Sequence, residues 1–260
     1  MIKEIDRKAF IHMTGWGAAG FLISSPGSLS NDSRIKAVAF DAFPIFDPGS
    51  IFKPIHELLP AQAKQVVELW QAKQFSYQWL RGLGNKYKNF LDIARNALDF
   101  ALAQSKVSLS EKEKELIMEG YDRMLIWPDV VPALQAIKKE GLKISFLSNM
   151  TSKMLHRGIQ NSNLSDFFDL VLSTDEKRTY KPVAYAYQMA VEQLKLKKEE
   201  ILFVPFAGWD LAGAKWFGYP TFWVNRSGSL LENLDAEPDG SGSTLNDLVE
   251  FLRRRNKDQF

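Results

Sequence analysis

Residues 35–41, Ile35-Lys36-Ala37-Val38-Ala39-Phe40-Asp41, form a short apolar run that ends at a carboxylate. Such a run predicts a buried β-strand. Four later runs have the same character, at residues 143–147, 169–172, 201–204 and 221–224. Helix-like stretches separate the runs, at residues 132–139, 182–194 and 208–217. This alternation predicts an α/β fold in which a doubly wound parallel sheet is covered by helices on both faces.

A long segment after the first predicted strand interrupts this alternation. Residues 54–125 contain no strand-like run, and their apolar residues recur at steps of three and four, as in Leu91, Ala94, Leu98 and Leu102. That spacing is typical of amphipathic helices. We therefore predict an inserted helical cap subdomain at residues 51–125, within a core domain made of residues 31–50 and 126–260.

The N-terminal 30 residues differ from the rest of the chain. Asp6-Arg7-Lys8-Ala9-Phe10-Ile11 precedes an apolar, glycine-rich stretch at residues 15–23. This layout is typical of an export signal and resembles a twin-arginine signal in which Lys8 takes the place of the second arginine. We predict a signal at residues 1–30 and a periplasmic or exported protein; the alternative is an N-terminal extension on a cytoplasmic protein. The apolar stretch is too short to span a bilayer, so we predict no membrane span.

The composition excludes several kinds of chemistry. Lys plus Arg total 33 against 31 Asp plus Glu, so charge gives no support to nucleic-acid binding. The chain has no Cys and only three scattered His, which excludes thiolate catalysis and the usual zinc motifs. We predict no metal and no cofactor. Catalysis must then use carboxylates, Lys, Ser, Tyr or amides.

Polar residues follow the predicted strands at the edge where ligands of parallel sheets gather. Asp41 ends the first strand, Ser148 and Asn149 end the second, Lys181 follows the third, and Asp210 follows the fourth. Taken singly, each has an ordinary interpretation as a loop, a helix cap or a solvated residue. Because they end successive strands, their convergence favours an active site.

Seven motifs follow one another along residues 35–255: Ala39-Phe40-Asp41, Trp70-Gln71-Ala72-Lys73-Gln74, Tyr87-Lys88-Asn89-Phe90, Leu147-Ser148-Asn149, Tyr180-Lys181-Pro182, Trp209-Asp210 and Trp223-Val224-Asn225-Arg226. This ordered series resembles the haloacid dehalogenase (HAD) superfamily, most closely its L-2-haloacid dehalogenase (type II) branch. The resemblance implies a HAD-like, Rossmann-type core with a helical cap. It also implies a hydrolase that releases halide from a small 2-haloalkanoic acid, without a metal.

In that family the first-strand aspartate, here Asp41, attacks carbon and forms an aspartyl ester that water cleaves. A carboxylate needs a neighbouring cation and a dry pocket to act as a nucleophile. Lys181 can supply the cation, while Asp210 either holds Lys181 or orients the hydrolytic water. By resemblance, Ser148 and Asn149 hold the substrate carboxylate or the nucleophile.

The same resemblance places other residues around the substrate. Gln71 is expected to bind it, and Tyr187, Phe90, Trp209 and the region of Trp70 are expected to wall the pocket. The alternative for these aromatic residues is ordinary core packing.

The chain departs from the family pattern at several positions. Pro44-Ile45 shortens the turn after Asp41 and lacks a threonine hydroxyl, Gln71 replaces an arginine, and Pro205-Phe206-Ala207 replaces polar residues. A phosphatase of the superfamily would carry a second aspartate where this chain has Phe43. Halide departs without a proton, so the absence of that acid favours dehalogenation.

Three functions therefore stay open. The first is a haloacid dehalogenase with weak or altered specificity, and the second is a degenerate site that binds a small anion without turnover. The third is a hydrolase that acts on another activated carbon or on a phosphate substrate. The resemblance also implies a homodimer formed through the helical insert.

Overall fold

The core of the protein is a parallel β-sheet in a computed structural model, whose described residues are 34–257. Its strands are β1 (Ala37–Phe40), β4 (Lys143–Ser148), β5 (Leu170–Ser173) and β6 (Ile201–Val204), in the order β5-β4-β1-β6. All three neighbouring pairs are parallel. A bridge between Phe203 and Thr221 brings β7 (Phe222–Val224) beside β6, and β7 pairs with β8 (Gly240–Gly242). The predicted doubly wound parallel sheet is confirmed.

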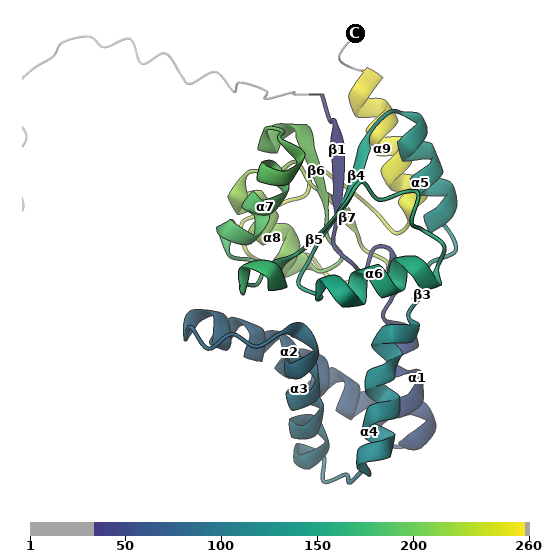
Figure 1. Cartoon of the computed structure of the whole chain (residues 1–260), viewed down its shortest axis with the longest axis vertical. Coiled ribbons are helices and arrows are strands. Elements are labelled where there is room, and N and C mark those ends of the chain that lie inside the picture. The colour runs from purple at the N-terminus through teal and green to yellow at the C-terminus, as the bar shows by residue number, and fades with distance from the viewer. Residues whose placement is uncertain (1–33, 258–260) are drawn as a thin grey trace, which may run out of the picture. The chain divides into compact units, whose positions relative to one another are not determined.

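Helices cover both faces of this sheet (Figure 1). Val38 and Phe40 of β1 belong to one apolar cluster, which includes α5 (Val130–Lys139) and α9 (Leu245–Lys257). Ala37 and Ala39 belong to a second, smaller cluster with α7 (Ala184–Leu194) and α8 (Gly208–Phe217). Successive residues of a strand point to opposite faces. β1 is therefore apolar throughout because both of its faces are buried.

Four α-helices and a 3-10 segment form a helical insert between β1 and β4. They are α1 (Gly49–Leu58), α2 (Ala63–Leu83), α3 (Phe90–Gln104), α4 (Glu111–Met118) and η2 (Glu119–Arg123). The chain enters the insert through β2 (Phe46–Asp47) and leaves it through β3 (Leu125–Ile126), and these two strands pair antiparallel. The first helix begins two residues before the predicted boundary at residue 51. The remaining elements of the core are α6 (Ser152–Asn161), η3 (Thr174–Lys177) and η4 (Lys198–Glu200).

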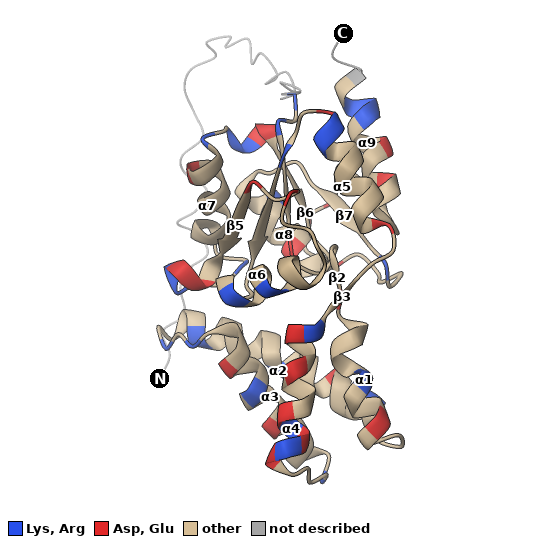
Figure 2. Ribbon diagram, turned by 45° about the vertical axis from the view of Figure 1, so that its right-hand side comes forward, with Lys and Arg blue, Asp and Glu red and all other residues tan. Residues whose placement is uncertain are grey.

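Local signals set the helix starts in the insert. The Asn89 side chain accepts a hydrogen bond from the backbone N–H of Asp92 at the start of α3, and Ser110 and Glu113 form a capping box at the start of α4. Acidic and basic residues are interspersed on α3 and α4 (Figure 2). Arg95 of α3 bonds Glu115 of α4 at 2.7 Å, so charged residues join the two helices on their exposed side.

Aromatic residues join the insert to the core. Trp209, at the start of α8, lies edge-to-face against Phe75 (5.3 Å between ring centroids) and Trp79 (5.6 Å) of α2. The Tyr87 hydroxyl donates to Asp175 Oδ1 at 2.5 Å, and the Tyr180 hydroxyl donates to the carbonyl of Lys88. These contacts seat α2 and the loop before α3 on the carboxyl edge of the sheet.

The predicted export signal at residues 1–30 lies outside the described residues. Among residues 34–257, none of the helices combines the length and the apolar character that a membrane crossing requires.

Two glycines in helices give a matched pair of stability predictions. A Cβ on Gly213 of α8 would lie 2.5 Å from both the Tyr187 hydroxyl and Cβ of Pro182, whereas a Cβ on Gly82 of α2 would meet nothing within 4 Å. We expect Gly213→Ala to destabilise the protein by about 1–3 kcal/mol through overpacking. Gly82→Ala should be neutral or stabilising by up to about 1 kcal/mol, because alanine favours helix. Urea unfolding of both variants tests this, and equal effects would contradict it.

Candidate active site

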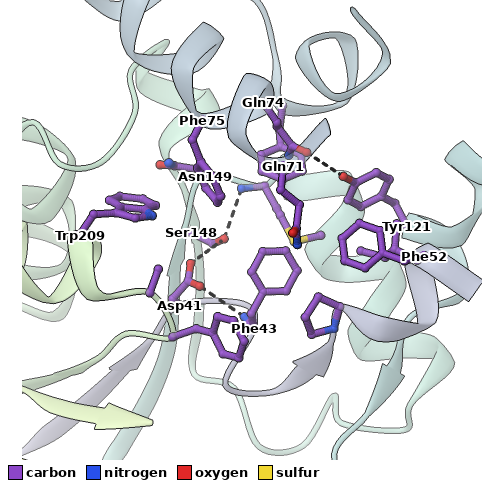
Figure 3. Close-up of a pocket in the computed structure, with 16 residues that line it drawn as sticks. Asp41, Phe43, Phe52, Gln71, Gln74, Phe75, Tyr121, Ser148, Asn149 and Trp209 are labelled. Carbon is purple, nitrogen blue, oxygen red and sulfur yellow. Dashed lines mark hydrogen bonds between the residues drawn. The ribbon is translucent and has the colours of Figure 1, made fainter. Parts of the chain in front are cut away.

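The Asp41 carboxylate, directly after β1, is the centre of the site (Figure 3). Its Oδ1 accepts hydrogen bonds from Lys181 Nζ at 2.9 Å and from Ser148 Oγ at 3.4 Å. Its Oδ2 faces the backbone N–H of Phe43 at 3.4 Å. The side chain is 13% exposed and lines a cavity, so it can reach a ligand. The structure therefore brings Asp41, Ser148 and Lys181 together, as predicted.

Lys181 lies between two carboxylates and forms an ion pair with each. Its Nζ is 2.9 Å from Asp41 Oδ1 and 2.5 Å from Asp210 Oδ2, and its side chain is 1% exposed. Burial by itself would lower the pKa of Lys181, but Asp210 and Asp41 more than offset this and raise it. The amine therefore stays charged. With Lys181 and both carboxylates ionised, the cluster carries a net charge of −1.

Asp210 is the more deeply buried of the two carboxylates. Burial raises its pKa to about 6, against the opposing effect of Lys181. Its Oδ1 accepts a hydrogen bond from the Tyr187 hydroxyl at 2.7 Å. Asp210 does not line the cavity, because Lys181 lies between it and Asp41. Of the two predicted roles for Asp210, the geometry favours holding Lys181 over orienting water.

Tyr187 does not wall the pocket, and that expectation was wrong. The residue is fully buried on α7, where its ring packs edge-to-face on Phe203 at 5.6 Å and its carbonyl accepts a hydrogen bond from Tyr219 at 2.6 Å. Because α7 covers one face of the sheet, Tyr187 reaches the site from behind, where its hydroxyl hydrogen-bonds Asp210. Its role is to position Asp210.

Asn149 connects three parts of the chain. Its Oδ1 accepts hydrogen bonds from the backbone N–H of Lys181 at 2.8 Å and from Thr174 Oγ1 at 3.1 Å, and its Nδ2 donates to Gln78 Oε1 at 3.2 Å. Asn149 also lines the cavity. Sequence reasoning missed Gln78 and Thr174. Gln74 and Gln78 continue the buried side of α2 that Ala63, Val66 and Trp70 begin, and this pair of glutamines at helical spacing is the signal that could have indicated Gln78.

The cavity beside Asp41 has a volume of about 120 Å³. A single water needs about 10–15 Å³ by this measure, so the cavity has room for a molecule of several heavy atoms. Its polar lining comes from Asp41, Gln71, Gln74, Ser148 and Asn149. The other lining residues are apolar or aromatic: Phe43, Pro48, Ile51, Phe52, Phe75, Phe90, Tyr121, Met150, Phe206, Ala207 and Trp209.

Three of the predicted pocket residues, Gln71, Phe90 and Trp209, do line the cavity. The indole Nε1–H of Trp209 is buried and has no hydrogen-bond partner among the described residues. Trp70 does not line the cavity. It is fully buried, and its Nε1–H donates to the carbonyl of Ala94 at 2.7 Å, so the alternative of core packing applies to it.

The loop after Asp41 is fixed from outside the insert and the sheet. Trp127 Nε1–H donates to the carbonyl of Phe43 at 3.0 Å, and Arg226 donates to the carbonyl of Pro44 at 3.0 Å. Arg226 in turn pairs with Asp129 at 2.9 Å. These contacts fix the loop that carries the backbone N–H of Phe43, from which Asp41 Oδ2 accepts a hydrogen bond.

This arrangement suits nucleophilic attack by a carboxylate. Lys181 and Ser148 both donate to Oδ1, whereas Oδ2 accepts a single longer hydrogen bond, from the backbone N–H of Phe43 at 3.4 Å, so Oδ2 is the oxygen better placed to attack a ligand in the cavity. The largely apolar lining removes water from that oxygen, and Lys181 keeps the carboxylate oriented. Residues 34–257 contain no group of three or more His, Cys, Asp or Glu placed to hold a metal ion.

Activity is expected to fall as the pH drops through about 6. There Asp210, whose pKa burial raises to about 6, takes up a proton and ceases to pair with Lys181 as an anion. The raised pKa also means that Asp210 stabilises the fold at low pH and that this contribution is lost as the pH rises through about 6. A profile of kcat/KM from pH 4.5 to 8 measures the loss of activity. The residual activity of Asp210→Asn should not show this decrease at low pH. An unchanged decrease would assign the loss of activity to the protonation of another group.

Comparisons with known proteins agree with this geometry. The family model described as haloacid dehalogenase-like hydrolase matches residues 35–218. An (S)-2-haloacid dehalogenase of Pseudomonas sp. (strain YL) is 34% identical, over 84% of this chain and 94% of its own. A crystal structure of an L-2-haloacid dehalogenase superimposes with a TM-score of 0.83 at 34% identity, over 85% of this chain and all of that chain.

A third similar structure carries a bound molecule. It is the L-2-haloacid dehalogenase of Xanthobacter autotrophicus with chloropropionic acid covalently bound, which has a TM-score of 0.77 and 30% identity over 84% of this chain and 98% of its own. The family match spans most of the described chain, and the relatives are matched almost end to end. The chain therefore belongs to the haloacid dehalogenase-like hydrolase family.

Proposed function

We propose that the protein hydrolyses the carbon–halogen bond of small 2-haloalkanoic acids. The observation that carries the proposal is the Asp41 carboxylate, which opens into an enclosed, mainly apolar cavity while Lys181 Nζ holds its Oδ1 at 2.9 Å. Relatives named as 2-haloacid dehalogenases, one of them with chloropropionic acid covalently bound, support the same reaction.

In the first step, Asp41 Oδ2 attacks C2 of the substrate. A carbon–oxygen bond forms, the carbon–halogen bond breaks, and halide leaves with its electron pair. Halide needs no proton, which suits a cavity in which no general acid faces the leaving group. The Trp209 ring lines the cavity in which the halide departs.

In the second step, water attacks Cγ of the aspartyl ester. Negative charge develops on Oδ1, where Lys181 Nζ and Ser148 Oγ already donate hydrogen bonds. These donors act as an oxyanion hole. The Cγ–Oδ2 bond then breaks, one proton of the water goes to the 2-hydroxy acid, and the other is released. Asp41 is regenerated with an oxygen from water.

Ser148 thus binds the nucleophile Asp41, and Asn149 positions Lys181. Ser148 Oγ donates to Asp41, while Asn149 Oδ1 is occupied by the backbone N–H of Lys181 and by Thr174. The substrate carboxylate is left to the neutral donors of the cavity, among them Gln71.

The test is chloride release from (S)-2-chloropropionate by the full chain, followed by turnover in ¹⁸O-labelled water. We expect chloride to appear and Asp41 to gain one heavy oxygen, detected by mass spectrometry of its peptide. Release of chloride without label on Asp41 would overturn the ester mechanism. No release from chloro- or bromopropionate would overturn the proposed function.

A phosphatase is the competing hydrolase, and the degenerate site is not favoured by relatives that are named as enzymes. Phe43 occupies the second position after Asp41, where a phosphatase of this fold needs a carboxylate. A screen of phosphomonoesters with and without magnesium separates the two reactions.

We also propose that the protein is exported through a signal at residues 1–30 and that it dimerises through the insert. N-terminal sequencing of the mature protein tests the first proposal, and a measurement of its size in solution tests the second.

A further inference from the structure

The charge of the cavity is unusual for a site that takes an anion. Asp41 is the single charged residue in the lining. The nearest cation, Lys181, is 1% exposed and already paired with Asp41 and Asp210. Arg226, the other buried cation close to the loop after Asp41, pairs with Asp129. A ligand in this cavity therefore meets a net charge of −1 and no free cation among the residues that line it.

Two effects make the binding of a substrate carboxylate in this cavity unfavourable. It must leave water for a mainly apolar lining, and it must lie beside the anionic nucleophile without a cation to offset the repulsion. A carboxamide presents the same halogenated carbon next to a carbonyl group but carries no charge. The charge balance of the site therefore favours the neutral substrate over the acid.

Gln71 supplies a partner suited to a carboxamide. It lines the cavity from α2, with its amide directed toward the centre of the pocket (Figure 3). No hydrogen bond ties the Gln71 side chain to another described residue, whereas the neighbouring Gln74 accepts one from Tyr121 at 3.1 Å. A primary amide offers two donors and one acceptor, so it can both donate to and accept from the amide of a ligand.

We propose that the protein also releases halide from neutral 2-halocarboxamides, and that Gln71 is the residue that selects them. The chemistry is that of the proposed function, on which this inference rests: Asp41 Oδ2 displaces halide from C2, and hydrolysis of the ester yields the 2-hydroxycarboxamide. The amide bond of the substrate is not broken.

The experiment compares chloride release from (S)-2-chloropropionamide and (S)-2-chloropropionate by the full chain at pH 7.5. Each enzymatic kcat/KM is divided by the rate constant at which acetate displaces chloride from the same compound in water. This correction removes the difference in intrinsic reactivity between the two compounds. We expect the corrected kcat/KM of the amide to equal or exceed that of the acid. Turnover of the acid with a corrected preference of more than tenfold over the amide would overturn this inference alone. No chloride from either compound would overturn the proposed function and this inference with it.

Two variants of Gln71 separate charge from shape. Gln71→Arg places a cation in the cavity and should move the amide-to-acid ratio of kcat/KM toward the acid by at least about tenfold, since a charge-assisted hydrogen bond replaces a neutral one. Gln71→Met keeps the length without charge or donor, and it should lower turnover of the amide without improving turnover of the acid. An unchanged ratio in Gln71→Arg would show that position 71 does not select the substrate.

Discussion

Asp41→Asn is expected to abolish halide release, with kcat lowered by at least roughly 1,000-fold, because the amide oxygen is a poor nucleophile and cannot form the ester. The fold should survive the change. Asp41 lies at the cavity, and its replacement brings the net charge of the buried cluster from −1 to zero. Halide release and the thermal unfolding midpoint, measured on the same preparation, test both statements.

Asp47→Asn is the matched control for this variant. Asp47 lies six residues further along, at the end of β2, where its side chain accepts a hydrogen bond from the backbone N–H of Gly49 at 2.8 Å and does not line the cavity. Its replacement should leave kcat within about twofold of the parent, because the Asp47 side chain does not line the cavity. An Asp41→Asn protein that keeps more than a few per cent of the parent rate would assign the nucleophile to another residue.

Lys181→Met should damage both activity and stability. It removes the single cation between two carboxylates that are 13% and 2% exposed, and an unpaired buried charge costs about 3–5 kcal/mol. Turnover should fall by at least roughly 1,000-fold, because the nucleophile loses its orienting partner and Oδ1 loses a donor in the hydrolytic step. Urea unfolding and halide release measure the two effects.

The double variant Lys181→Met with Asp210→Asn separates these effects. Removing the second carboxylate lowers the unbalanced charge, so part of the lost stability should return, whereas the activity should not. A positive coupling energy between the two positions is expected from groups in one ion-pair network. Strictly additive losses of stability would contradict the ion-pair role that we assign to Lys181.

The sequence predicts the centre of the site well for a physical reason. Asp41, Ser148 and Lys181 are close in space because they follow strands that run parallel, and the carboxyl ends of such strands share one edge. The order of apolar runs therefore suffices to place them together. The hydrophobic spacing of the insert likewise predicts helices, although not that α1 begins at Gly49.

The sequence could not indicate contacts that depend on the direction of a side chain from a distant element. Tyr187 was expected at the pocket wall because its position follows a family motif, but the turn of α7 points it at Asp210 from behind. Trp127 and Arg226 bind the carbonyls of Phe43 and Pro44, and no spacing rule links residues so far apart in the chain. The hydrogen bond between Gln78 and Asn149 depends in the same way on how α2 packs on the sheet.

The short ladder of β2 and β3 has an evolutionary consequence. The chain departs toward the helices at Phe46–Asp47 and comes back at Leu125–Ile126, and these two points are hydrogen-bonded neighbours. If the helical insert between these two points is exchanged for another, only the two adjacent points where the chain enters and leaves it need to match. The chemical machinery of Asp41, Ser148 and Lys181 lies wholly outside the exchanged piece, whereas Gln71 and Phe90 lie within it. Recombination at this ladder can thus change which substrate is bound while the catalytic residues, and with them the reaction, are kept.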